Sequence, residues 1–138
     1  MEAQTVKRAV LDASAVMTFL YDRPGAERVT TLLERASDGH TELLMTVVNW
    51  GEVYYSVWRA EGKATAEGIV AQIARLPVNI IEVDVELTKL AAEFRALHKL
   101  PYADCFAAAL ARLRKAVVAT ADNDFRDVDG KVLILWIT

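Results

Sequence analysis

The segment VKRAVLDAS, residues 6–14, predicts a short, mostly apolar strand that ends directly at an acid, Asp12. A second apolar run, residues 116–120, leads to another acid, Asp122. Helical patterns separate these runs from the other predicted strands, so the order favours an α/β sandwich with a mainly parallel central sheet. Ligands of such sheets bind outside the carboxyl ends of the strands, which is where both acids would lie.

The remaining elements are predicted from hydrophobic spacing and from breaker residues. Further strands are expected over 42–45, 79–83 and 132–136, and helices over 14–21, 24–36, 46–60, 64–75, 84–97 and 101–114. Pro24 suits the first turn of its helix, and Gly39 follows the end of that helix. The helix that Asp84 caps should bury one apolar face, formed by Leu87, Leu90, Ala91, Phe94 and Leu97.

The composition indicates a compact protein. Its 138 residues, of which 54% are hydrophobic, predict a single domain over residues 1–138. Secretory and membrane-spanning patterns are absent, and the one cysteine, Cys105, excludes an internal disulfide and a cysteine-based zinc site. We therefore expect a cytoplasmic protein without membrane contact. The net charge of −3 argues against a nucleic-acid partner, unless the acids surround metal ions that reverse the local charge.

Asp104 is the only charged residue of the segment ADCFAAALA, residues 103–111. A helix that is apolar on every side is normally buried, so this carboxylate needs a partner, and a metal ion is one. The alternative is a first-turn acid that only complements the helix dipole. Asp12 and Asp122 have a similar alternative, because aspartate is a good helix cap and turn former.

Glu52 belongs to a polar stripe on its predicted helix, which consists of Asn49, Glu52, Ser56 and Arg59. The plainest interpretation of such a stripe is a solvated helix face. Beside it runs an aromatic stripe of Trp50, Tyr54 and Trp58. Aromatic stripes are typical of a core or a dimer contact, and base stacking is the alternative.

Acids from separate elements can share one function if they converge. Mg²⁺ and Mn²⁺ prefer oxygen ligands, and three or four carboxylates around such ions can bind a scissile phosphate. The ion lowers the pKa of a water molecule and stabilises charge on the phosphate oxygens. Without the ion, clustered carboxylates repel each other. The acids that this hypothesis groups are Asp12, Glu52, Asp104 and Asp122.

Four segments in this order make the chain resemble a PIN domain, and specifically a VapC-type toxin of a toxin–antitoxin pair. They are VLDAS at 10–14, VNWGEV at 48–53, LPYADCFAAA at 100–109 and TADNDF at 120–125. The resemblance spans nearly the whole chain and implies a three-layer fold. It also implies RNA cleavage that depends on Mg²⁺ or Mn²⁺, a homodimer, and a cognate antitoxin whose peptide crosses the active-site groove.

The same resemblance assigns site residues. The invariant acids of the family match Asp12, Glu52 and Asp104, and the fourth, more variable acid matches Asp122, with Asp124 close enough to share or replace it. Supporting polar positions match Ser14, Asn49 and Thr120. Basic residues are by default ordinary solvated charges. As candidates for RNA contact we name Arg59 and Lys99, which lie on the same predicted helices as the acids or near them.

Other activities stay open at this point. Metal-free cleavage by two imidazoles would need His40 and His98 in one site, and their polar-turn and helix-end positions disfavour this. A phosphatase with an aspartyl nucleophile commonly has a second aspartate where this chain has Ser14, and the chain has no P-loop. An RNA-processing PIN nuclease and a catalytically silent PIN binding module fit the same motifs as a toxin.

Overall fold

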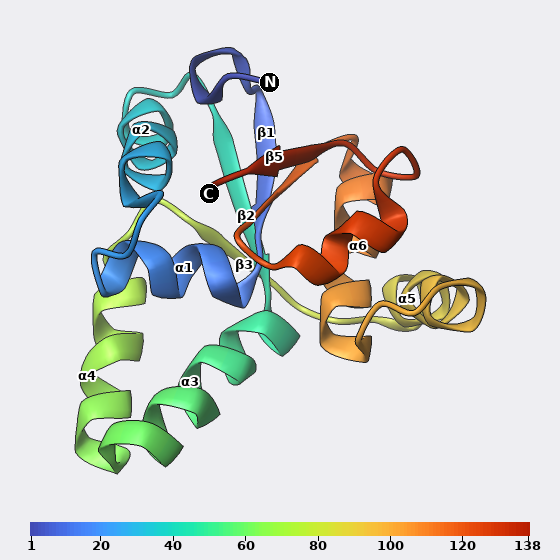
Figure 1. Ribbon diagram of the computed structural model, residues 1–138. Coiled ribbons are helices and arrows are strands. Elements are labelled where there is room, and N and C mark those ends of the chain that lie inside the picture. Colours follow the sequence, from blue (N-terminus) through green and yellow to red (C-terminus); the bar gives the residue numbers. More distant parts are fainter.

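The computed structural model describes residues 1–138 and has a five-stranded, all-parallel central sheet with helices on both faces (Figure 1). The α/β sandwich predicted from the sequence is therefore confirmed. In spatial order the strands are β3 (Asn79–Ile81), β2 (Glu42–Thr46), β1 (Arg8–Leu11), β4 (Val117–Thr120) and β5 (Ile134–Trp136).

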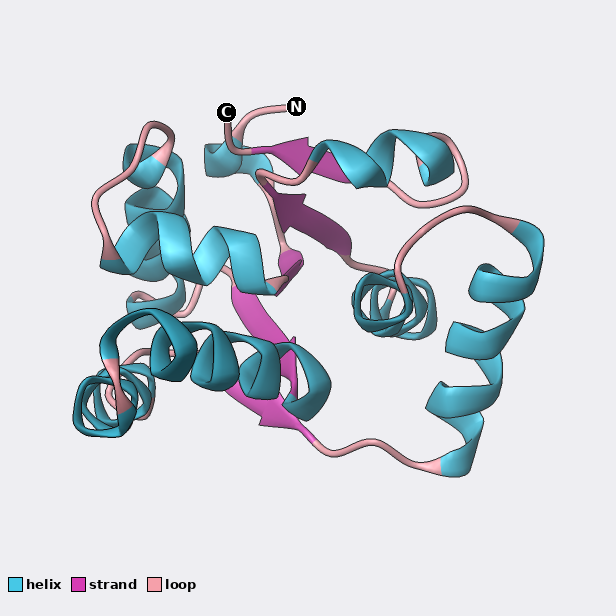
Figure 2. Cartoon of the chain, turned by 60° about the horizontal axis from the view of Figure 1, so that its bottom comes forward, coloured by secondary structure: helices cyan, strands magenta, loops and turns pink.

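Two groups of helices sandwich the sheet (Figure 2). One face is covered by α1 (Ala13–Leu20), α2 (Ala26–Ser37), α3 (Val47–Glu61) and α4 (Lys63–Ile73). The other is covered by α5 (Val85–Leu97) and α6 (Tyr102–Arg114). Two short 3₁₀ helices, η1 (Ala3–Thr5) and η2 (Asn123–Val128), complete the chain. None of the helices combines the length and apolarity that a membrane crossing requires.

Strand β1 shows why both faces of the sheet are covered. Ala9 and Leu11 pack into the core beneath α1 to α4, whereas Val10 packs into the core beneath α5 and α6. The neighbouring strand β4 repeats the pattern with Ala119 on the first face and Val118 on the second. Successive side chains of a strand point to opposite faces, so consecutive apolar residues in a strand need cover on both faces of the sheet.

The chain enters the sheet in its middle, which fixes where a ligand can bind. Strand β1 pairs with β2 on one side and with β4 on the other. The chain first moves outward through β2 and β3 and then crosses back to β4, so the direction of winding reverses between β1 and β4. Ligands of open parallel sheets bind at such a switch point, beyond the carboxyl ends of the strands. Asp12 and Asp122 follow these two strands.

The start of α2 differs from its prediction. The helix begins at Ala26, so Pro24 lies outside the first turn. Its N-cap is Gly25, which has a left-handed φ of 99°. A Cβ atom on Gly25 would lie 2.5 Å from the carbonyl oxygen of Ile137, so both the backbone angle and the close approach require glycine.

The predicted apolar face of α5 is also wrong at one end. Leu87, Ala91 and Phe94 are buried, but Leu97 is 69% exposed. Leu97 is the last residue of α5, and the chain leaves the helix there toward α6. Hydrophobic spacing alone does not predict at which residue a helix face stops being buried by its neighbours.

Candidate metal centre

Asp12 is a buried acid whose two oxygens are both held. The carboxylate N-caps α1: Oδ1 accepts the N–H of Ala15 at 2.8 Å and the hydroxyl of Ser14 at 2.7 Å. Oδ2 accepts the hydroxyl of Thr120 at 2.5 Å. Burial raises the pKa of Asp12 to about 6, although these hydrogen bonds lower it, and the charge of Asp122 raises it further. The helix cap expected as an alternative is thus present, and it orients the acid at the sheet edge.

Two hydroxyl groups join the ends of β1 and β4. The oxygens of Ser14 and Thr120 lie 3.2 Å apart. Ser14 accepts the N–H of Ala121, and Thr120 accepts the N–H of Asp122, both at 2.9 Å. These bonds hold Asp12 beside the turn that carries Asp122.

Three carboxylates converge beside this turn. One oxygen from each of Asp104, Asp122 and Asp124 lies within 4.8 Å of the others. Asp104 comes from the first turn of α6 and is 5% exposed, whereas Asp122 is half-buried and Asp124 is exposed. Asp122 accepts the N–H of Asp124 at 2.9 Å and so caps η2. The sequence left Asp122 and Asp124 as alternatives for the fourth acid, and the structure places both in the group.

Asn49 fixes α3, and with it Glu52, against α6. Its amide nitrogen donates to the carbonyl of Ala103 at 3.2 Å, and its amide oxygen accepts the hydroxyl of Thr46 at 2.7 Å. Asn49 is 0% exposed, so the polar stripe of α3 is not a solvated face at this position. Oε1 of Glu52 is buried and has no hydrogen-bond partner. Burial raises the pKa of Glu52, the amide of Asn49 opposes this shift, and the negative charge of Asp122 reinforces it.

Asp104 is the electrostatic centre of the group. Its pKa is raised to about 8, first by burial and then by the charges of its neighbours, which are, in decreasing order, Asp12, Asp122, Glu52 and Asp124. Like charges disfavour ionisation of a buried carboxyl. Asp12 and Glu52 thus lie outside the three carboxylates whose oxygens are within 4.8 Å of one another, but their charges act on Asp104.

The donor set fits a divalent cation. All of its side-chain ligands are carboxylate oxygens, which hard cations such as Mg²⁺ and Mn²⁺ prefer. No lysine, arginine or histidine pairs with these acids, because the ion pairs of the structure are Arg8–Glu42 and His98–Asp127. A bound cation would offset the mutual repulsion of the acids, and the buried Oε1 of Glu52 has no hydrogen bond that would compete for it.

The sequence matches the PIN domain family over residues 9–131. This chain belongs to the PIN domain family. The family resemblance stated from the four sequence segments is therefore confirmed. No curated protein sequence matches this PIN domain.

Solved structures with the same PIN fold come from several bacteria. VapBC2 from Rickettsia felis, bound to a DNA fragment of its promoter, has a TM-score of 0.73 and 16% identity over 93% of this chain and 96% of that chain. VapBC-1 from nontypeable Haemophilus influenzae has a TM-score of 0.70 and 18% identity over 94% and 98%. Mycobacterium tuberculosis VapC20, a sarcin–ricin loop cleaving toxin, has a TM-score of 0.65 and 18% identity over 86% and 92%. These similarities establish the fold.

The predicted RNA-contact residues of this PIN domain lie outside the acid group. Arg59 is exposed near the end of α3, and its guanidinium lies 5.5 Å from the ring centroid of Tyr55. Lys99 is exposed between α5 and α6. Neither side chain forms a hydrogen bond or ion pair with the acids, so a role in RNA binding stays a prediction for both.

The sequence missed how Thr46 and Asn49 act together in this PIN domain. Thr46 caps the start of α3, because its hydroxyl accepts the N–H of Asn49 at 3.1 Å. Its hydroxyl also donates to the side chain of Asn49, which frees the amide of Asn49 to bond α6. A threonine cap followed by asparagine three residues later indicates the contact between these two residues. No sequence pattern indicates that Asn49 also bonds the carbonyl of Ala103 on α6.

Proposed function

We propose that this PIN domain is a metal-dependent endoribonuclease that hydrolyses RNA phosphodiesters. The proposal depends on one observation: oxygens of Asp104, Asp122 and Asp124 lie within 4.8 Å of one another, from two separate elements. Bound Mg²⁺ or Mn²⁺ would supply charge stabilisation at the scissile phosphate and would acidify the attacking water.

The residues of the site divide into those that would bind the ion and those that hold the ligands in place. The residues that would hold the ion are Asp104, Asp122 and Asp124, whose oxygens lie close together, and Asp12 and Glu52, which match the invariant acids of the family. Ser14 and Thr120 keep the carboxylate of Asp12 oriented by donating to its two oxygens. Asn49 holds α3, which carries Glu52, against the start of α6.

The open position of the acids favours a polymer as substrate. Asp124 is exposed and Asp122 is half-buried, so the group faces solvent. None of the four surface cavities is lined by these acids. Small-molecule sites normally enclose most of their ligand. An open edge instead leaves room for an RNA strand that extends beyond the reacting phosphate.

Cleavage by the purified protein tests the proposal. We expect RNA cleavage with Mg²⁺ or Mn²⁺, its loss with EDTA, and its loss in Asp104→Asn. Asp38→Asn is the matched control, because Asp38 is exposed at the end of α2, away from the acids. Comparable cleavage by Asp104→Asn would refute the assignment. Calorimetric silence with both metals would favour a binding module instead.

A histidine mechanism gains no support from the arrangement. His40 precedes β2 and so lies at the edge where the strands begin. His98 precedes α6 and pairs with Asp127 of η2, beyond the edge where the strands end. Two imidazoles at separate edges cannot act as acid and base on one phosphate. Cleavage that persisted in EDTA would reopen this mechanism.

We further propose that the protein is the cytoplasmic toxin of a type II toxin–antitoxin module, and that it acts as a homodimer controlled by a cognate antitoxin. The fold similarity to VapBC proteins of Rickettsia felis and Haemophilus influenzae supports this role. We expect wild type, but not Asp104→Asn, to arrest growth when it is expressed alone. Normal growth combined with RNA cleavage in vitro would instead favour an RNA-processing PIN nuclease.

A further inference from the structure

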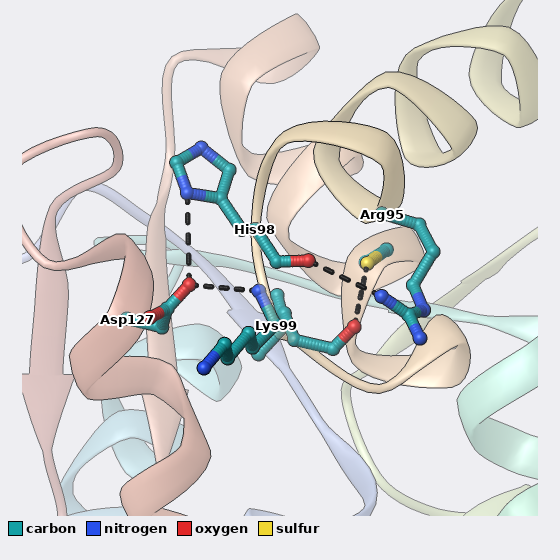
Figure 3. A network of polar contacts seen from close by, with 6 residues as sticks. Arg95, His98, Lys99 and Asp127 are labelled. Carbon is teal, nitrogen blue, oxygen red and sulfur yellow. Dashed lines mark hydrogen bonds and ion pairs between the residues drawn. The ribbon is translucent and has the colours of Figure 1, made fainter.

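Hydrogen bonds fix the short connection between α5 and α6, residues 98–101 (Figure 3). The guanidinium of Arg95 donates to the carbonyl of His98 at 3.3 Å, and the thiol of Cys105 donates to the carbonyl of Leu100 at 3.4 Å. Between them, the N–H of Lys99 donates to Oδ2 of Asp127 at 2.9 Å. The connection therefore has a partner at three consecutive residues.

Asp127 is the partner that comes from a distant part of the chain. Arg95 and Cys105 flank the connection in α5 and α6, whereas Asp127 belongs to η2. Oδ2 of Asp127 also lies 3.6 Å from Nδ1 of His98, so one carboxylate contacts two successive residues (Figure 3). This contact ties η2 to the start of α6.

The two segments that Asp127 joins each carry an acid of the candidate metal centre. Asp124 lies three residues before Asp127 in η2, and Asp104 lies five residues after Lys99 in the chain. No hydrogen bond joins Asp104 and Asp124, and the two carboxylates repel each other when both are ionised. The bond from Lys99 to Asp127 is the hydrogen bond that connects η2 with residues 98–104.

Hydrogen bonds hold other acids of the site in place. Asp12 is held by Ser14 and Thr120, and α3 with Glu52 is held by Asn49. Carboxylates must keep a defined spacing around a small cation, because Mg²⁺ demands a near-ideal octahedral geometry. Between η2 and the segment that leads into α6, the buried packing of Phe125 and Val128 is joined by the polar contacts of Asp127.

We propose that Asp127 is a positioning residue of the metal centre. By holding η2 against the start of α6, it sets the spacing of Asp104 and Asp124 around the ion. Asp127 itself contacts neither the ion nor the substrate. This inference rests on the proposed metal-dependent function.

Mn²⁺ affinity of the purified full chain, measured by electron paramagnetic resonance, tests the inference. Asp127→Ala removes the acceptor of the Lys99 N–H and should weaken Mn²⁺ binding by about 10-fold at most, the low end of the loss for a hydrogen bond to a metal ligand, because Asp127 contacts no ligand directly. Asp127→Asn keeps an acceptor oxygen and should bind Mn²⁺ nearly as wild type does. Asp129→Ala removes an exposed aspartate of the same segment, whose side chain makes no hydrogen bond, and should leave the affinity unchanged.

A second measurement separates positioning from general loss of structure. The side chain of Asp127 is 43% exposed, so we expect its variants to fold, and Asp127→Ser provides a second short replacement. In the metal-free proteins, amide hydrogen exchange should accelerate at Lys99 and η2 in the alanine and serine variants, with the rest of the sheet protected as in wild type.

The outcomes distinguish the inference from the proposed function. Unchanged Mn²⁺ affinity in both Asp127→Ala and Asp127→Ser, with binding intact in wild type, would overturn the inference alone. An equal loss in Asp129→Ala would also overturn it, because the effect would then be one of general charge. Absence of Mn²⁺ binding by wild type would overturn the proposed function, and the inference with it.

Discussion

Replacing Asp104 with asparagine should make the metal-free protein more stable while it abolishes activity. Asp104 is 5% exposed, and its pKa is raised from 3.8 to about 8. Between these values the folded protein keeps a proton that the unfolded chain releases. A raised pKa therefore costs stability as the pH increases, and near pH 7 the cost reaches about 4 kcal/mol at most.

Asparagine does not titrate, so the variant avoids the loss of stability that the raised pKa of Asp104 causes. The amide is still a buried polar group, and we expect a net gain of about 2 kcal/mol near pH 7. Urea unfolding in EDTA measures the gain. The advantage should shrink near pH 4, because Asp104 is then largely protonated in the folded protein and half-protonated in the unfolded chain. Asp38→Asn, an exposed change of the same type, should leave the free energy of unfolding unchanged.

Bound metal should make wild type more stable than Asp104→Asn. A ligand at 100 times its Kd stabilises the folded state by about 2.7 kcal/mol. Wild type should gain this increment from Mn²⁺, whereas Asp104→Asn should gain much less. An asparagine variant that is less stable than wild type near pH 7 without metal would refute the reasoning. So would an advantage that stays constant from pH 4 to pH 7.

Two further substitutions examine the supports of the site and the fold. Thr120→Val should lower the free energy of unfolding by about 1–3 kcal/mol, because Asp12 loses a donor and the part-buried N–H of Asp122 loses its acceptor. Thr120→Ser should restore most of this loss in urea unfolding. Equal stability of the valine variant would contradict this. Gly25→Ala should cost more than Gly39→Ala, for which the positive φ alone predicts about 1–2 kcal/mol, because only at Gly25 would the new Cβ meet backbone. Calorimetry that finds equal losses would argue against the close contact.

The position of Asp12 and Asp122 at one edge of the sheet could be predicted because it depends only on local sequence patterns. β1 and β4 are short runs of apolar residues, and each is followed by an acid within two positions. Parallel order then brings both carboxyl ends to one edge without knowledge of any contact. By contrast, η2 has no hydrophobic period, and a glycine N-cap with positive φ at Gly25 has no signal as strong as a serine or aspartate cap.

The proximity of Glu52 to Asp104 was not available from local patterns. It depends on the bond from Asn49 to Ala103, which spans 54 positions, and on the packing of α3 against α6. On its own helix, Glu52 looks like part of a solvated stripe. The preference of Mg²⁺ and Mn²⁺ for several carboxylates, and then the resemblance to a family, suggested that these acids meet. The tie from Asp127 to Lys99 had no sequence signal either, because any exposed aspartate can accept such a bond.

The bond from Thr120 to Asp12 joins residues 108 positions apart, which has a consequence for synthesis of the protein. A nascent chain that has not yet included β4 contains Asp12, Glu52 and Asp104, but lacks the hydroxyl that holds the first of them and the acids at 122 and 124. Long-range pairings of this kind also form late in folding. On the proposed function, the chain should therefore gain RNA-cleaving activity only when translation is nearly complete.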